Sequence, residues 1–307
     1  MKRGVYLFLC LTSFCSVSVF ASVYNLKPVK ITENVWCFFG ERSSPTLKNK
    51  GNMVNSCFFD GGDISVAIDT GPTYTYAKEA AEIIKKTTKK APSLVINTHY
   101  HDDHLGGNLY YKEAGAKIIG DINIKKAYEQ KPDRFDRMQK MLPPSIAGKS
   151  GVALPTEYIE SNTTVKTANG DIEILKLSKH SHTESDVVVF LKKQKAVIAG
   201  DIVFNDMISP LRDADINGWL EAIAALKKLD NKYLIGGHGD KTSKNGYEFM
   251  EGYLTKLRES VRTAIKEGAD MNTITQKVDM SGYKNAAIYD EVNGKNILRA
   301  YELFEME

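Results

Sequence analysis

The sequence HYHDDH constrains this chain most, because it places three of the six histidines within residues His99–His104. The preceding run SLVINT (residues 93–98) is short and apolar, as is typical of a buried strand. A spacing of two residues just past a strand lets the imidazoles of His99 and His101 point to one side. A turn after them can aim Asp103 and His104 at the same point. Imidazoles and carboxylates are ligands that zinc prefers, so the cluster predicts a metal site rather than a polar loop with surface histidines.

Three further candidate ligands occur later in the chain, each where an apolar run meets a loop. His182 lies just before the run VVVF, Asp201 directly follows AVIAG, and His238 directly follows YLIGG. Taken singly, each of these residues is a weak signal. Together with the cluster they form a set, and we expect them to converge on one edge of the sheets.

Strand-like and helix-like patterns alternate along the chain, with hairpins mixed in. Strands are predicted at residues 27–39, 54–59, 65–69, 93–98, 171–177, 187–192, 195–200 and 233–240. Helices are predicted at residues 75–88, 105–112, 122–130, 133–141 and 215–229, and the chain is mostly helical from residue 246. This order predicts one layered α/β domain with mixed sheets over residues 22–307. Residues 246–307 form its helical C-terminal part, which either packs on the domain or contacts a second subunit in a homodimer.

The first 21 residues are typical of a signal peptide. Lys2 and Arg3 precede an apolar run, and Val19 and Ala21 put small side chains where signal peptidase requires them, so we expect cleavage after Ala21. The alternative is an uncleaved anchor helix, for which the apolar run is short. We therefore expect a periplasmic or secreted protein with no stable membrane insertion after cleavage.

Loss of Lys2 and Arg3 leaves 39 of the 41 basic residues against 38 acidic ones, a balance of +1. A nearly neutral chain gives no reason to expect nucleic acid as a partner, and we expect a small-molecule substrate instead. Cys37 and Cys57 are the two cysteines of the mature chain, and they lie in strand-like runs that could pair as a hairpin. In an oxidising compartment we expect them to form a disulfide, the alternative being two buried thiols.

These motifs resemble those of the metallo-β-lactamase superfamily. The resemblance rests on HYHDDH, on His182-Thr183 before a hairpin, on Gly200-Asp201, on Gly-His238-Gly, and on AIDTGP at residues 67–72. It covers roughly residues 30 to 240. It implies a four-layer αβ/βα sandwich, with the active site along the edge where the two halves meet and a helical C-terminal extension after it.

The resemblance also implies a role for each residue at that edge. His99, His101 and His182 would hold a first metal ion, and Asp103, His104 and His238 a second, with Asp201 bridging the two. Asp69 would support the backbone of the cluster from behind the ligands. His180 has no counterpart in the family, so we expect it to be an exposed loop residue, and Asp102 is expected to be solvated.

The resemblance implies an exported hydrolase that uses a metal-bridging hydroxide on a small ester, thioester, lactone or β-lactam. Two divalent ions are expected, zinc first and iron as the alternative, and Asp103 would orient the hydroxide and shuttle its proton. Two other interpretations stay open. One is a mononuclear iron persulfide-type dioxygenase, and the other is a non-catalytic metal-binding protein.

Two features bear on the choice within the family. The β-lactamases with a cysteine ligand keep a cysteine where this chain has Asp201 and a lysine where it has Phe204, so the pattern is closer to general hydrolases. The polar loop at residues 40–52 is expected to lie over the metals. Its Arg42, Lys48 and Lys50 would favour an anionic substrate, unless the loop is simply solvated.

Overall fold

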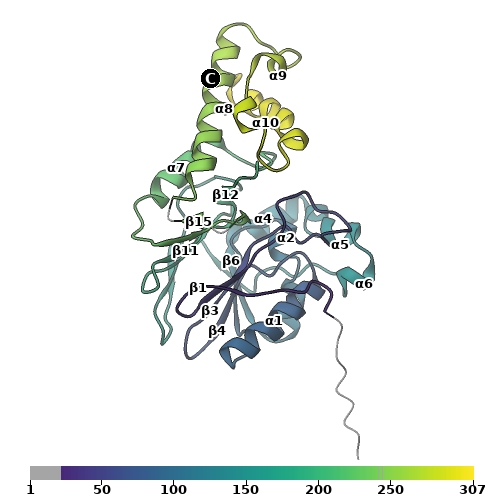
Figure 1. Cartoon of the computed structure of the whole chain (residues 1–307), viewed down its shortest axis with the longest axis vertical. Coiled ribbons are helices and arrows are strands. Elements are labelled where there is room, and N and C mark those ends of the chain that lie inside the picture. The colour runs from purple at the N-terminus through teal and green to yellow at the C-terminus, as the bar shows by residue number, and fades with distance from the viewer. Residues whose placement is uncertain (1–21, 241, 244) are drawn as a thin grey trace, which may run out of the picture.

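The computed structural model describes residues 22–240, 242–243 and 245–307 (Figure 1). The predicted signal peptide, residues 1–21, lies outside the described residues. No helix in the described part of the chain combines the length and the apolar character needed to cross a membrane. Two sheets lie face to face, and helices cover their outer sides (Figure 1).

The first sheet has seven strands, in the same order as they occur in the chain. Its first four strands are antiparallel and the remaining ones run parallel to the fourth. The strands are β1 (Val29–Thr32), β2 (Val35–Phe38), β3 (Ser56–Asp60), β4 (Ser65–Ile68), β5 (Leu94–Ile96), β6 (Lys117–Asp121) and β7 (Glu157–Ile159). Parallel strands bring their carboxyl ends to one edge, so the loops after β4 and β5 lie side by side.

The second sheet has six strands in the order β15-β13-β11-β10-β9-β8. All its neighbours are antiparallel except β11 and β13. The strands are β8 (Thr163–Val165), β9 (Ile172–Leu175), β10 (Val188–Leu191), β11 (Ala196–Ile198), β13 (Tyr233–Ile235) and β15 (Thr242–Ser243). A separate short parallel pair is formed by β12 (Phe204–Asn205), which follows β11, and β14 (His238–Gly239), which follows β13.

The helices divide between the outer faces and the C-terminal part. Those before the second sheet are α1 (Tyr74–Thr88), α2 (Asp102–Leu105), α3 (Asn108–Glu113), α4 (Ile122–Gln130), α5 (Arg137–Met141) and α6 (Pro144–Ala147). The helices that follow β12 in the chain are α7 (Ile216–Leu226), α8 (Glu248–Lys266), α9 (Ile274–Lys277) and α10 (Tyr289–Phe304). Short 3-10 turns occur at η1 (Pro132–Arg134), η2 (Gly200–Ile202) and η3 (Ser281–Tyr283).

Three buried clusters confirm the predicted four-layer sandwich. The central cluster joins the facing sides of the two sheets, for example Val66 and Ile96 of the first with Val189 and Ile198 of the second. A second cluster packs the outer face of the first sheet against α1 and α3. The third packs the outer face of the second sheet against α7, α8 and α10. The layers are therefore helix, sheet, sheet and helix.

The C-terminal part is helical, as predicted, and stands at one end of the sandwich beyond β12 (Figure 1). Its three helices share the apolar core of α7 and the second sheet. The predicted disulfide is also confirmed, because Cys37 and Cys57 are bonded to each other. They face one another across the antiparallel pair β2–β3.

Candidate metal centre

The seven predicted ligands lie in loops at one end of the two sheets. His99–His104 follow β5, and α2 begins within the cluster. His182 lies in the loop between β9 and β10, Asp201 lies in the η2 turn after β11, and His238 lies in β14 after β13. The two halves of the sandwich thus each supply part of one site.

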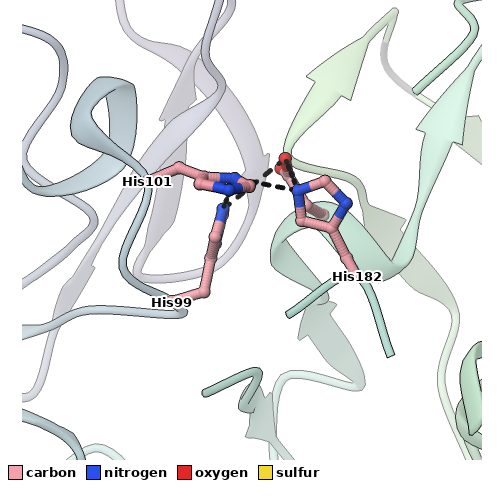
Figure 2. A group of neighbouring side chains, drawn as sticks. His99, His101 and His182 are labelled. Carbon is pink, nitrogen blue, oxygen red and sulfur yellow. Dashed lines mark hydrogen bonds and ion pairs between the residues drawn. The ribbon is translucent and has the colours of Figure 1, made fainter. Parts of the chain in front are cut away.

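The first group brings together His99, His101, His182 and Asp201, with one ligand atom from each within 4.8 Å of the others. Figure 2 shows the three imidazoles pointing toward a common point. Nδ1 of His101 lies 3.0 Å from Nε2 of His99 and 2.9 Å from Nε2 of His182. Oδ2 of Asp201 lies 3.6 Å from Nε2 of His99 and 3.1 Å from Nε2 of His182.

The second group consists of Asp103, His104 and His238, all of them buried. Nε2 of His104 and Nε2 of His238 are 3.3 Å apart, and Oδ2 of Asp103 lies 3.2 Å from Nε2 of His238. Asp201 reaches this group too, with Oδ1 3.0 Å from Nε2 of His104 and Oδ2 3.4 Å from Nε2 of His238. Its carboxylate therefore lies between the two groups.

The spacing of these atoms fits divalent metal ions. Two nitrogens bound to one tetrahedral zinc at about 2.1 Å are about 3.4 Å apart, close to the separations of 2.9 to 3.3 Å between the imidazole nitrogens. Nδ1 of His101 faces two other nitrogens at once, although it can share a proton with only one of them. Oδ1 of Asp201 is buried and makes no hydrogen bond of good geometry, although Nε2 of His104 lies 3.0 Å away, so it can serve as a ligand to a cation. The residues present therefore fit a two-metal centre.

The ring nitrogens that point away from the centre are held by protein groups. Asp69 Oδ2 lies 2.8 Å from Nδ1 of His104, and the Met53 carbonyl oxygen lies 2.8 Å from Nδ1 of His238. On the first group, Asp213 Oδ2 lies 3.3 Å from Nε2 of His101. Ser209 Oγ lies 3.3 Å from Nδ1 of His182, and Thr98 Oγ1 lies 3.1 Å from Nδ1 of His99. Such partners fix the orientation of each ring and raise its basicity as a ligand.

Close backbone packing holds Asp201 in place. A Cβ atom at Gly237 would lie 1.9 Å from Oδ1 of Asp201, so the link between β13 and β14 can pass the carboxylate only with glycine at this position. Gly200 adopts a φ of +52°, and a Cβ there would lie 2.6 Å from Oγ1 of Thr98. The glycines in AVIAGD and LIGGHGD therefore permit the convergence of the two loops.

Burial and charge separate the pKa values of the histidines. Burial, reinforced by the positive field of His104, holds the pKa of His99 well below its ordinary value, and burial lowers the pKa of His101 to about 4. Burial opposes protonation of His238 as well, but the carboxylates of Asp201 and Asp103 raise its pKa to about 9. The same carboxylates and Asp69 raise the pKa of His104.

The two carboxylates of the centre stay ionised despite their burial. Burial alone would raise the pKa of Asp103, but His104 and His238 outweigh it and hold that pKa below the ordinary range. His238 and His104 do the same for Asp201. Asp103 and Asp201 therefore favour positive charge between the groups, which is the charge that divalent cations supply.

Two expectations about flanking residues are wrong. Asp102 is buried rather than solvated, because Arg137 Nη2 donates to its Oδ1 at 2.9 Å and the Met138 amide donates to its Oδ2 at 2.6 Å. His180 is half-buried rather than exposed, and its Nε2 lies 2.7 Å from the carbonyl oxygen of Asp213. His180 belongs to neither group of candidate metal ligands.

Asp213 is the site residue that sequence reasoning missed. Its buried carboxylate accepts from Nε of Arg212 at 2.9 Å and pairs with Arg134, in addition to its contact with His101. Burial opposes ionisation of Asp213, yet His101 and Arg212 hold its pKa well below the ordinary range. The available signal was the first of the two aspartates in LRDAD, directly before the helix that the second, Asp215, caps.

A cavity of about 140 Å³ opens beside the two groups. Asp103, Asp201 and the histidines His101, His182 and His238 form its floor. Ser44 and Pro45 also line it, so the loop at residues 40–52 does reach the site. The rest of the lining consists of Met53, Arg137, Phe204, Pro210, Arg212, Asp213, Ile288 and Val292.

The expected role of the loop cations is not supported. Arg42 pairs with Asp240 at 3.4 Å and with Asp206 at 3.8 Å, and Lys50 Nζ contacts the carbonyl oxygen of Val23. Neither they nor Lys48 line the cavity. Arg137 and Arg212 line it instead, with side chains about half exposed. The cationic side chains that line the cavity are therefore these two arginines, which pair with Asp102 and Asp213.

Comparison with known proteins places these features in context. The sequence model of the Metallo-beta-lactamase superfamily matches residues 49–238. The type 2 metallo-beta-lactamase of Bacillus cereus is 27% identical over 218 residues, which cover 69% of this chain and 75% of that protein. A beta-lactamase-like protein 2 homolog of Caenorhabditis elegans is 20% identical over 261 residues, or 82% of this chain and 78% of that protein.

Solved structures share the fold. A metallo-beta-lactamase from Pontibacter korlensis superposes with a TM-score of 0.61 at 22% identity, over 75% of this chain and 99% of that one. The metallo-beta-lactamase FIM-1 from Pseudomonas aeruginosa, solved in a mono-zinc form, gives a TM-score of 0.60 at 20% identity, over 75% and 95% of the two chains. About a quarter of the present chain therefore has no counterpart in these structures.

Proposed function

This chain belongs to the metallo-beta-lactamase superfamily, and from that premise we propose that it is an exported metal-dependent hydrolase. Its proposed cofactors are two divalent metal ions, with zinc as the first candidate. Its proposed substrate is a small ester, thioester, lactone or β-lactam. The position of Asp201 carries the proposal. Its carboxylate lies within 3.0 to 3.6 Å of Nε2 of four histidines, two from each group. A carboxylate so placed would serve as a ligand to metal held by either group of histidines.

The chemistry divides between the ions and the chain. When bound, two divalent ions lower the pKa of water and polarise a carbonyl oxygen. Asp103 lines the cavity as an ionised carboxylate, so it can orient the attacking water by accepting a hydrogen bond and carry a proton toward the leaving group. Arg137 and Arg212 also line the cavity, each paired with an aspartate, and their remaining N–H groups can donate hydrogen bonds to a carboxylate or carbonyl oxygen of the substrate.

The dimensions of the cavity support a small substrate. A volume of about 140 Å³ is well below the roughly 300–1,000 Å³ of sites that enclose drug-sized ligands. A β-lactam antibiotic would place only part of its structure inside. Simple esters, thioesters and lactones therefore suit the cavity better than antibiotics with large side chains.

Two observations support export. The first 21 residues carry the basic start, the apolar run and the small residues at the expected cleavage site. The Cys37–Cys57 disulfide is typical of proteins that mature in an oxidising compartment. The distribution of the full chain between cell fractions, with and without residues 1–21, tests this part of the proposal.

The zinc-loaded protein should be assayed against a panel of the four substrate types. We expect Asp201→Ala to weaken binding of one ion most and to abolish turnover, because both groups lose their shared carboxylate. Asp230→Ala is the matched control, since Asp230 is exposed and pairs with Lys195 at 2.9 Å. Full activity of the Asp201 variant would exclude a two-metal mechanism, and zinc binding without turnover of any substrate would indicate a non-catalytic metal-binding protein.

A further inference from the structure

One wall of the cavity comes from the C-terminal helical part. Ile288, which precedes α10, and Val292, in its first turn, line the cavity together with Phe204 of β12. Phe204 stacks on the ring of His238, with the centroids 4.7 Å apart. The family match ends at residue 238, so it includes Phe204 but neither Ile288 nor Val292. The C-terminal part therefore contributes to the cavity from outside the matched residues.

Hydrogen bonds hold this apolar wall in place relative to the predicted metal ligands. The Ala287 amide donates to the carbonyl oxygen of Asp206 at 2.9 Å, and the Ile208 amide donates to the carbonyl oxygen of Ala287 at 3.1 Å. Asn296 of α10 donates from Nδ2 to the carbonyl oxygen of Ser209 at 2.8 Å and accepts from the Leu211 amide at 2.9 Å. One segment, residues 206–213, thus holds α10 and also carries the Ser209 and Asp213 side chains that orient His182 and His101.

A second contact closes the wall from the other side. Ser44 Oγ, in the loop at residues 40–52, hydrogen-bonds to Oε2 of Glu291 on α10. Both Ser44 and Pro45 line the cavity. The loop and the helix therefore meet beside the cavity.

Ile288 adopts a strained conformation at this wall. Its φ is +56°, in the left-handed region, where a β-branched residue is rarely found. The two hydrogen bonds of Ala287 fix the chain directly before it. Glycine would adopt this φ without strain, so the side chain of Ile288 costs stability at a position where it touches the cavity. Strain of this kind is concentrated at ligand-binding sites.

We propose that Ile288 and Val292 form a specificity wall for the substrate, and that the substrate carries a short apolar substituent that packs against them. The proposal depends on the proposed function in one respect, the chemical group that reacts. That group would lie at Asp103 and Asp201. The cavity volume of about 140 Å³ limits the size of that substituent. The substituent is therefore a short chain or a small ring.

The test measures binding rather than turnover. Straight-chain carboxylates from acetate to octanoate are titrated into the zinc-loaded protein by calorimetry. We expect the dissociation constant to fall about fourfold per methylene, the factor for full burial of a CH₂ group, until the cavity is filled. In Ile288→Gly combined with Val292→Ala, we expect less than a twofold change per methylene. No dependence on chain length in the wild type, or the same dependence in the variant, would overturn the proposal.

The variants are chosen to keep the protein folded. Ile288→Gly should unfold at the same temperature as the wild type or higher, because it removes the strain at φ +56°. Leu298→Ala is the matched control, since Leu298 lies on α10 in the C-terminal core and does not line the cavity. It should keep the wild-type dependence on chain length. Ethyl esters of the same acids are assayed separately, so a protein that binds the series without hydrolysing the esters would contradict the hydrolase and leave the wall intact.

Discussion

The carboxylate of Asp69 accepts a hydrogen bond from Nδ1 of His104, with 2.8 Å between Oδ2 and the ring nitrogen. The same carboxylate accepts from the amide and the hydroxyl of Thr98, each at 2.8 Å. Asp69 has a φ of +59° directly after β4, and this turn directs its side chain under the loop that follows β5. One buried side chain therefore fixes both the backbone at the start of the histidine cluster and the ring at its end.

Asp69→Asn should weaken zinc binding by about 10- to 100-fold, the usual effect of removing a group that orients a ligand. The amide preserves the shape of the side chain but replaces an oxygen that holds the His104 ring. Competition with a chromophoric chelator measures the affinity. Asp63→Asn, on the exposed turn between β3 and β4, should bind zinc as the wild type does. Equal affinity in both variants would show that Asp69 does not position His104.

The convergence of the seven residues could be anticipated from the sequence because each lies where an apolar run ends. Partners from distant segments could not. The pairing of Asp102 with Arg137 joins residues 35 positions apart, and that of His101 with Asp213 joins residues 112 positions apart. Only the packed structure brings the η1–α5 segment and the loop before α7 to the cluster. A local pattern therefore identifies ligands better than the groups that hold them.

Reduction of the disulfide between Cys37 and Cys57 should lower the free energy of unfolding by about 3 kcal/mol, the chain-entropy value for a separation of 20 residues. Urea unfolding with and without a thiol reductant measures the difference. The double variant Cys37→Ala, Cys57→Ala should not respond to the reductant. A wild type equally stable in both conditions would mean that the crosslink contributes nothing to stability.

Glu79 should make the attachment of residues 22–26 sensitive to acid. Its carboxylate accepts from Ser22 Oγ at 2.6 Å and from the amides of Val23, Tyr24 and Leu26 at 3.1, 3.0 and 2.8 Å. Burial opposes its ionisation, but these hydrogen bonds hold the pKa of Glu79 below its ordinary value. A lowered pKa means that the stabilisation is complete above the ordinary value and is lost as pH falls through the folded-state value.

Hydrogen exchange of residues 22–26 tests this directly. In the wild type, protection of these amides should persist at neutral pH and be lost in acid, at a pH below the ordinary pKa of a glutamate. In Glu79→Gln, protection should be low at every pH. Glu82→Gln, on the same helix, is the control and should retain the wild-type profile. Protection that does not change with pH in the wild type would contradict the role of Glu79.

Removal of metal should destabilise the whole domain. Asp103, Asp201, His104 and His238 are buried together, and cations bound only by the folded state stabilise it by mass action. We expect a chelator to lower Tm by on the order of 5 °C or more relative to the zinc-loaded protein. Asp201→Ala should show a smaller difference. Identical unfolding curves with chelator and with zinc would argue against metal binding at this cluster.

The sheets were predicted unevenly. Strands β3, β4, β5, β10 and β11 are apolar and almost wholly buried, so their runs stand out in the sequence. The sequence patterns did not predict β6, β7 or β8. KIIGD of β6 is short and bounded by polar residues, and β7 and β8 are only partly buried edge strands. Their pairing is decided by neighbouring strands rather than by their own composition.

The most direct test of the two-metal account is a count of metal ions per chain. The full chain is expressed with its own residues 1–21, purified from the exported fraction without chelators, and analysed by elemental mass spectrometry. We predict two divalent ions per chain, zinc first, falling to one or none in Asp201→Ala. A single iron per chain would contradict the account and would favour oxygenation of a sulfur substrate, which oxygen uptake would then measure.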